Sequence, residues 1–314
     1  MRDEVKRLDE DSMENLSLKE TIRILTRKHL EEHNGILLGE CVSDPGGVAG
    51  TIPESSNVID LPMTETAGAD IAVGCALAGR RPIFVTRFQD FMLMNGSPIV
   101  YFAGVYQPLC GISAPVFVRA LANDGFDATH SNVLHSLFMH FSGIKVCAPI
   151  TPGEYKQVWN CYLAEELPYY VSEFRDCYNN QLELMDEIVP GAQLNVFGVS
   201  ICRMRIREAK KILKQWGIQI NIVDIMWLKP FDAVGKGKVL KKLPLGLVVD
   251  PGRSICGAAE HLAYELMMQY PGSHVEVLGV DDRIKTPSEV YQNPVPTAEM
   301  IANKVYTIIK GRIS

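Results

Sequence analysis

Glu65 is a carboxylate whose position after a predicted strand could suit acid–base chemistry. It stands in the run 60–68, DLPMTETAG, which follows a short apolar segment and leads into a helix rich in Ala, Gly and Cys. Ligands of open parallel sheets bind beyond the carboxyl ends of the strands, so a carboxylate directly after a strand is a catalytic candidate. A carboxylate before a helix also complements the helix dipole. Taken alone, Glu65 fits both interpretations.

Two aromatic residues, Phe88 and Phe91, follow the next apolar run in the segment FQDF, 88–91. Their rings could form a stacking wall for a flat heterocycle. Aromatic residues at strand ends pack more often in the core, so this segment alone does not decide between the two roles.

Two further polar segments also follow predicted strands. The loop 123–131, NDGFDATHS, carries Asp127 and His130, and charged residues on a loop are a better indication of function than buried ones. Arg175 lies in SEFRD, 172–176, where it could bind an anion or pair with the neighbouring Asp176.

The elements that position these residues alternate between short apolar runs and helical stretches. Ser17 and Glu20 form a capping-box pattern at the start of a helix. Strands are predicted at 36–38, 57–59, 82–85, 114–118, 145–147 and 169–171, and helices at 67–78 and from 152 onward. Such alternation predicts a parallel sheet with helices on both faces.

The polar stretch 177–193 ends in Pro190 and Gly191 and is the best linker candidate. The alternation then restarts, with strands predicted at 194–199, 218–225, 245–250 and 275–278 and helices at 205–216 and 257–268. The sequence therefore predicts an α/β protein with one domain over residues 1–185 and a smaller one over 186–314.

Composition excludes several classes of protein. The 314 residues are 47% hydrophobic, which is enough for two cores, and the net charge of -6 offers no basic surface for nucleic acid. No apolar run approaches the length of a membrane span and the N-terminus is charged, so we expect a cytoplasmic protein. The eight cysteines lack zinc-like spacing, and His130, His135 and His140 recur every five residues, so no metal site is predicted in this chain.

The order of the four polar segments resembles the pyrimidine-binding and C-terminal domains of a thiamine-diphosphate enzyme family. These domains are shared by the β subunits of 2-oxo acid dehydrogenase decarboxylating components and by the second half of transketolase. The resemblance covers the chain from about Leu18 onward and is carried by PMTE with AG at 62–68, ALAGRRP at 76–82, FQDF, THS at 129–131 and the strand region 144–151. It implies two doubly wound α/β domains, a mainly parallel pyrimidine-binding domain followed by a smaller transketolase C-terminal-like domain.

The resemblance also implies roles on the cofactor side. Glu65 would bond to the aminopyrimidine ring of thiamine diphosphate and drive its amino group to the imino tautomer. Phe91, with Phe88 beside it, would stack on that ring. Glu40, at the end of the first strand, is a weaker candidate for cofactor binding.

On the substrate side, the resemblance places His130 where it could hydrogen-bond the substrate oxygen that develops charge. Asp127 and Arg175 would contact the substrate, and Arg175 would suit a phosphate or carboxylate group.

The Gly-Asp-Gly segment and later Asn with which this family binds magnesium are not found in the sequence. We therefore expect a separate α-type subunit to hold the diphosphate and its Mg²⁺, the assembly to be an α2β2 heterotetramer, and this chain to be inactive alone.

Three functions follow from the resemblance. The first is transfer of a two-carbon ketol unit between ketose phosphates, favoured by Asp127, the Thr129-His130 pair and Arg175. The second is decarboxylation of a 2-oxo acid with acyl transfer to a lipoyl domain, favoured by the β-subunit pattern. The third is a non-catalytic scaffold subunit, against which Glu65, Phe91 and His130 count.

Overall fold

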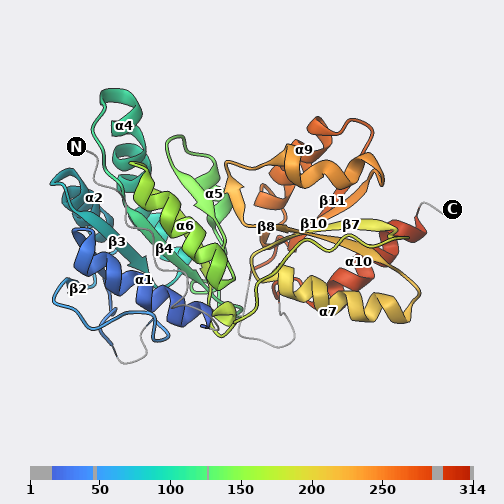
Figure 1. The fold of residues 1–314 in the computed structure, drawn as a ribbon, viewed down its shortest axis with the longest axis horizontal. Coiled ribbons are helices and arrows are strands. Elements are labelled where there is room, and N and C mark those ends of the chain that lie inside the picture. The colour runs from blue at the N-terminus through green and yellow to red at the C-terminus, as the bar shows by residue number, and fades with distance from the viewer. Residues whose placement is uncertain (1–15, 45–47, 126, 285–292, 312–314) are drawn as a thin grey trace. The chain divides into compact units, whose positions relative to one another are not determined.

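The chain forms two compact α/β units. The computed structural model describes residues 16–44, 48–125, 127–284 and 293–311 (Figure 1). Unit 1 comprises Met1–Asn123 with Leu137–Glu183, and unit 2 comprises Asp124–Ser136 with Leu184–Ser314. The prediction of a two-domain α/β fold is confirmed.

Unit 1 is built on a parallel sheet. Its strands follow the order β2-β1-β3-β4-β6-β5, and each neighbouring pair is parallel. They are β1 (Gly35–Glu40), β2 (Val58–Leu61), β3 (Arg81–Thr86), β4 (Phe117–Ala122), β5 (Lys145–Cys147) and β6 (Tyr169–Phe174). The order reverses at β1, so the carboxyl ends of β1 and β3 border the crevice in which a sheet of this kind binds its ligand.

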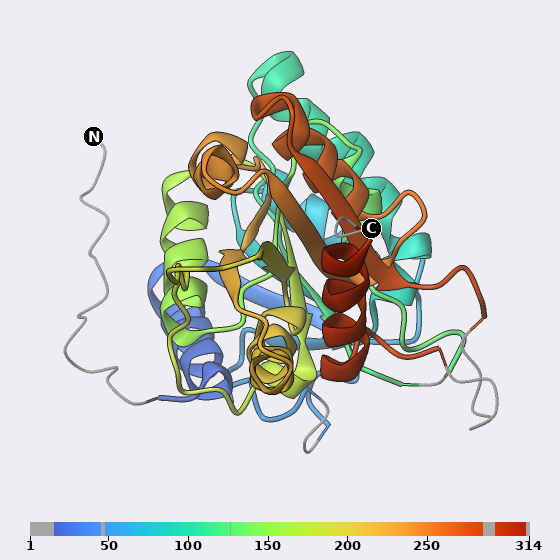
Figure 2. The same cartoon turned by 90° about the vertical axis from the view of Figure 1, so that its right-hand side faces the viewer.

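Helices cover both faces of this sheet. Figure 2 shows α1 (Leu18–Glu32) beside α6 (Pro152–Ala164), and these two helices are in contact. On the other face α2 (Gly68–Leu77) packs against α3 (Met92–Pro98), which continues through a π-helical turn, η3 (Ile99–Ala103), into α4 (Gly104–Cys110). A 3₁₀ turn, η2 (Gln89–Phe91), precedes α3, and α5 (His135–Met139) and a second 3₁₀ turn, η4 (Arg175–Cys177), complete the region.

The predicted capping box is confirmed at the start of α1. The Ser17 backbone N–H donates to Glu20 Oε2 at 2.8 Å, and the Glu20 backbone N–H donates to Ser17 Oγ at 3.4 Å. These bonds satisfy groups that have no partner within the first helical turn.

Unit 2 is a smaller parallel sheet with the order β11-β10-β7-β8. Its strands are β7 (Leu194–Val199), β8 (Ile220–Ile225), β10 (Leu245–Arg253) and β11 (His274–Val280). Helices α7 (Cys202–Gln215) and α10 (Ala298–Lys310) contact each other on one face, and α9 (Ala258–Gln269) covers the other (Figure 1). The unit also contains β9 (Trp227–Lys229), α8 (Ala233–Lys236) and η5 (Gly237–Lys241).

Strands β4 and β6 extend beyond their predicted ends. The sequence predicts strands at 114–118 and 169–171, whereas β4 runs to Ala122 and β6 to Phe174. The added residues include Arg119 and Glu173, whose charges interrupt the apolar runs. The two side chains neutralise each other across the neighbouring strands, with 2.7 Å between Nε and Oε1.

Segment 124–136 belongs to unit 2, although the sequence predicts it within the first domain. Asp124 accepts hydrogen bonds from Arg205 Nη2 at 2.8 Å and from the Val295 backbone N–H at 3.3 Å. His135 bonds to Asp250 of β10. These contacts arise between residues far apart in sequence, so local pattern does not predict them.

The structure has helices over residues 92–110 and in α10, where the sequence pattern predicts none. Pro98 and Pro108 lie inside α3 and α4, where proline is unfavourable, and many of the apolar side chains there are exposed. The helical pattern of residues 92–110 is therefore obscured. Across the described part of the chain, no helix has both the length and the apolar character needed to span a membrane.

Candidate functional site

Glu65 lies in the turn between β2 and α2, three residues before Gly68 begins the helix. Its side chain is half-buried, and among the described residues its carboxylate has no hydrogen-bond or ion-pair partner. A half-buried carboxylate without a partner at the carboxyl edge of a parallel sheet is available to bind a ligand.

Two carboxylates at the ends of β1 and β2 hold the loops around Glu65. Glu40 Oε1 accepts a hydrogen bond from the Thr64 backbone N–H at 2.8 Å. Asp60 accepts from the backbone N–H groups of Val42 at 3.1 Å and Ser43 at 3.3 Å. Burial raises the pKa of Asp60, but hydrogen bonds from Ser43 and Val42 outweigh it and lower the pKa below its ordinary value. Glu40 thus positions the residue next to Glu65.

Phe88 and Phe91 form a T-shaped pair directly after β3. Their ring centroids are 5.8 Å apart at an interplanar angle of 84°, and both side chains are half-buried. The intervening Gln89 is buried and donates to the Ala120 carbonyl at 3.1 Å and to Ser172 Oγ at 2.7 Å. These bonds fix the aromatic segment to β4 and β6.

Asn95 links the segment of Glu65 to the aromatic segment. Its Oδ1 accepts from the Ala69 backbone N–H at 3.3 Å, in the first turn of α2, and its Nδ2 donates to the Phe91 carbonyl at 3.3 Å. Asn95 is only 3% exposed. The helix can approach this closely because position 68 is glycine: a Cβ there would lie 3.0 Å from the ring of Phe84.

Asp127 and His130 form a separate cluster in unit 2. His130 Nδ1 lies 2.8 Å from Thr129 Oγ1 and 3.3 Å from Asp127 Oδ2. Asp127 Oδ1 accepts from the Thr129 backbone N–H at 2.7 Å and from its hydroxyl at 2.9 Å. These hydrogen bonds lower the pKa of Asp127. Asp127 therefore lies against the His130 ring within one loop.

Arg175 contacts Arg87 and Phe88 at the carboxyl edge of the sheet. Its Nη2 donates to the Arg87 carbonyl at 2.7 Å, and its guanidinium carbon lies 4.7 Å from the centroid of the Phe88 ring. Arg175 is thereby held beside the aromatic pair. Burial lowers the pKa of its guanidinium, and the positive charge of Arg87 adds to this effect.

Glu173, although adjacent to these segments, is structural. Its carboxylate is 1% exposed and is bonded to Arg119, to the Tyr155 hydroxyl at 2.7 Å and to the Tyr178 hydroxyl at 2.5 Å. Burial alone would raise its pKa, but the Arg119 charge and these hydrogen bonds hold the pKa below its ordinary value. Every oxygen of this carboxylate is already used, so Glu173 cannot serve a substrate.

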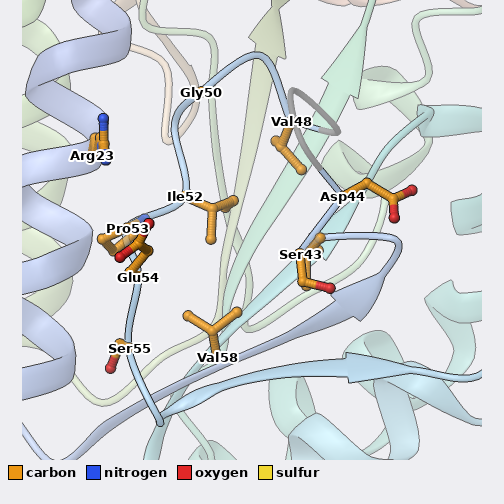
Figure 3. Close-up of a pocket in the computed structure, with 11 residues that line it drawn as sticks. Arg23, Ser43, Asp44, Val48, Gly50, Ile52, Pro53, Glu54, Ser55 and Val58 are labelled. Carbon is orange, nitrogen blue, oxygen red and sulfur yellow. The ribbon is translucent and has the colours of Figure 1, made fainter.

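A hollow of 410 Å³ opens beside the start of β2 and is lined by residues of 42–58 and by Arg23 of α1 (Figure 3). In Figure 3 Ile52, Val48 and Val58 present apolar side chains to it. Neither Glu65 nor the Phe88–Phe91 pair lines this hollow. It is therefore distinct from the residues singled out in the sequence.

The structure thus groups the candidates in two sets. Unit 1 brings together the segments of Glu40, Glu65, Phe88, Phe91 and Arg175, whereas Asp127 and His130 lie in unit 2. Asn95 and Arg87 contact residues of the first set but are not among the residues predicted from the sequence. An Asn within the apolar run of residues 92–103 is the signal that could have identified Asn95, because an amide buried there must find hydrogen-bond partners.

Within the described ranges, no group of three His, Cys, Asp or Glu side chains gathers closely enough to hold a metal ion.

Comparison with known proteins gives relatives over both units. The chain is 29% identical over 252 residues to the beta subunit of acetoin:2,6-dichlorophenolindophenol oxidoreductase of Cupriavidus necator, covering 73% of each chain. It is 26% identical over 243 residues to the 2-oxoisovalerate dehydrogenase subunit beta of Bacillus subtilis, covering 70% of this chain and 74% of the relative. With the chloroplastic pyruvate dehydrogenase E1 component subunit beta-3 of Arabidopsis thaliana it shares 28% identity over 208 residues, which are 62% of this chain but 51% of the relative.

Among solved structures, a split gene transketolase described as an inactive beta4 tetramer has the same fold. The TM-score is 0.73 at 17% identity, and the match covers 94% of this chain and 99% of the other. Residues 24–181 match the family model of the transketolase pyrimidine-binding domain, and residues 185–301 match that of the transketolase C-terminal domain. The chain therefore belongs to the transketolase family and carries its pyrimidine-binding domain followed by its C-terminal domain.

Proposed function

We propose that this chain is the β-type subunit of a two-component thiamine-diphosphate enzyme and that Glu65 activates the cofactor. The observation that carries the proposal is the half-buried Glu65 carboxylate, which has no partner in the described structure and lies next to a helix that Asn95 ties to Phe91. The similarity to β subunits of an acetoin oxidoreductase and of two dehydrogenases supports the same assignment.

The residues of unit 1 fit the aminopyrimidine end of this cofactor. A flat heterocycle requires an aromatic surface, and the half-buried rings of Phe88 and Phe91 offer one. A ring nitrogen requires a hydrogen-bonding partner that can share a proton, and the Glu65 carboxylate can serve. Glu40 supports this arrangement through the Thr64 backbone and stays a weaker candidate for cofactor contact.

When bound, thiamine diphosphate supplies a nucleophilic carbon that can attack a substrate carbonyl. Glu65 would hold a proton at the ring nitrogen and thereby favour the imino form of the neighbouring amino group. Phe88 and Phe91 would fix the plane of the ring and exclude water from one side. These tasks need a carboxylate at position 65, because an amide cannot give up a proton.

His130 is assigned to the substrate. Its Nδ1 contacts to Thr129 and Asp127 fix the orientation of the ring, and the imidazole would hydrogen-bond the substrate oxygen as charge develops there. Asp127 is a positioning residue in this scheme.

The partner would be an α-type subunit that binds the diphosphate and its Mg²⁺, in an α2β2 heterotetramer. An exposed apolar surface on α3, η3 and α4 supports an assembly: Leu93 is 67% exposed, Tyr101 63% and Leu109 76%. Apolar patches of this kind on a monomer mark interaction sites.

Two reactions remain candidates, each supported by a separate observation. Ketol transfer between ketose phosphates is supported by Arg175 and by the Asp127-oriented His130. Decarboxylation of a 2-oxo acid with transfer of the acyl group to a lipoyl domain is supported by the names of the relatives. A non-catalytic scaffold would have no need for an unpaired Glu65 carboxylate before a helix that Asn95 ties to the aromatic segment.

The test is co-expression with an α-type subunit, followed by a screen of 2-oxo acids and ketose phosphates with thiamine diphosphate and Mg²⁺. CO₂ release identifies decarboxylation. With an aldose phosphate added as the acceptor, formation of a ketose two carbons longer than that aldose identifies ketol transfer. A complex that assembles but binds no thiamine diphosphate, measured by calorimetry, would refute the proposal.

A further inference from the structure

Arg87 and Arg175 lie together at the carboxyl edge of the unit 1 sheet. Arg87 directly follows β3, and Arg175 directly follows β6. These strands flank β4, so the two residues are neighbours although 88 positions separate them in the sequence. The bond from Arg175 Nη2 to the Arg87 carbonyl, 2.7 Å long, holds them in this arrangement.

Neither guanidinium is neutralised by a carboxylate. Arg87 and Arg175 make no ion pair with any acid in the described parts of the chain. The Nε atom of each is buried and has no hydrogen-bond partner, and the same is true of Asn123 Oδ1, just beyond β4. Buried polar atoms without partners cost free energy, and the absence, among the described residues, of a neutralising carboxylate beside both guanidinium groups makes this edge favourable for an anion.

The two fully buried arginines among the described residues, Arg119 and Arg203, are each paired with an acid. Arg119 bonds Glu173 at 2.7 Å, and Arg203 bonds Asp224 at 3.0 Å, with both guanidinium groups fully enclosed. In both cases an acid on a neighbouring element offsets the free-energy cost of burying the guanidinium charge. The pair at the sheet edge departs from this pattern, and its position beside Phe88 connects it to the candidate cofactor site.

We propose that Arg87 acts with Arg175 to bind the anionic group of the substrate, a carboxylate or a phosphate ester. This rests on the proposed function and deepens it by adding Arg87 as a specificity-determining residue. Guanidinium groups bind such anions through parallel charge-assisted hydrogen bonds, and two of them in a half-buried site favour a charged substrate over its neutral analogue. Asn123 Oδ1 would accept a hydrogen bond from an adjacent hydroxyl group.

The experiment uses the assembled complex with thiamine diphosphate and Mg²⁺. Arg87→Met removes the charge and keeps a long side chain, Arg87→Lys keeps the charge, and Arg27→Met, on the exposed face of α1, is the matched control. Each variant is assayed with charged and neutral pairs: a 2-oxo acid against a neutral diketone, and a ketose phosphate against the unphosphorylated ketose. Inorganic phosphate and acetate are titrated as inhibitors.

We expect Arg87→Met to raise KM for the charged substrate by about 10-fold or more, with little change in kcat or in KM for its neutral analogue. Inhibition by the matching anion should weaken in parallel, Arg87→Lys should recover most of the affinity, and Arg27→Met should have no effect. The anion whose inhibition weakens, acetate or inorganic phosphate, shows whether the bound substrate group is a carboxylate or a phosphate.

An equal loss with charged and neutral substrates, or an unchanged KM for the charged one, would overturn the role of Arg87. Cofactor binding is measured in each variant by calorimetry, and circular dichroism verifies the fold. A wild-type complex that binds no thiamine diphosphate points instead to failure of the proposed function.

Discussion

His135 and Asp250 lie 115 residues apart in the sequence and form a buried hydrogen bond, with 2.9 Å between Nε2 and Oδ1. Both residues have 0% exposure, and Asp250 Oδ2 also accepts from the Gly252 backbone N–H at 2.8 Å. The bond joins β10 to the segment that carries His130, five residues earlier. The core of unit 2 therefore anchors the candidate substrate histidine.

Breaking this bond should destabilise unit 2. His135→Leu and Asp250→Leu each leave a buried polar partner unsatisfied, so we expect each to lower the free energy of unfolding by about 1–3 kcal/mol. The double variant should lose less than the sum, with a coupling of at least about 0.5 kcal/mol, in urea denaturation. Strict additivity would mean that the two side chains do not interact.

Glu65→Gln should preserve the fold and the assembly but reduce turnover by about 10²-fold or more, because an amide cannot transfer the proton. The matched control is Asp70→Asn, an exposed acid in the first turn of α2. Steady-state rates of the assembled complex are compared with thermal melts. Wild-type turnover in Glu65→Gln would remove the central assignment.

Asn95→Leu removes the bridge between α2 and the aromatic segment while nearly conserving volume. The Ala69 N–H and the Phe91 carbonyl lose their bonds to this side chain, so we expect a loss of about 1–3 kcal/mol in unfolding free energy and weaker binding of thiamine diphosphate. Ser97→Ala, at an exposed position of α3, serves as control. Unaltered cofactor affinity in Asn95→Leu would show that the bridge does not position the site.

Unit 1 should lose stability in mild acid because of His29. Burial lowers the pKa of His29 from 6.5 to about 4. Between these values the unfolded chain binds a proton that the folded chain does not, so stability decreases as the pH falls through this window. From pH 7.5 to pH 5 we expect a contribution of about 2 kcal/mol. Urea denaturation measured across this range tests the slope.

The matched variant for this test is His29→Gln, which keeps a donor for the Arg81 carbonyl, to which His29 Nε2 bonds at 2.8 Å. The variant should lose the His29 part of the pH dependence. An identical slope in both proteins would assign the effect to other groups.

The exposed surface of α3, η3 and α4 should be needed for assembly. Leu109→Glu places a charge where a partner would be buried, and we expect co-purification of the α-type subunit to fall by at least about 10-fold. Met268→Glu on α9, 61% exposed, is the control in unit 2. The chain should stay folded in both variants, as measured by circular dichroism, and normal assembly of Leu109→Glu would place the interface elsewhere.

The sequence alone determined the fold class and the start of the first helix, because both depend on patterns among nearby residues. The alternation of apolar runs with helices yielded a two-domain α/β fold, and Ser17 with Glu20 marked the start of α1, because capping and periodicity are read within a few residues. The order of motifs, from Glu65 to Arg175, resembled the correct family, which the matches over 24–181 and 185–301 confirm.

Only the tertiary structure decided which of these residues meet. Arg87 and Arg175 become neighbours because β3 and β6 flank β4, an order that the chain does not follow in sequence. Asn95 bonds to α2 only because α3 packs against that helix. Arg119 is accommodated in β4 because Glu173 neutralises its charge. Each is a long-range contact between polar groups, and its free energy is gained only after the strands and helices have packed.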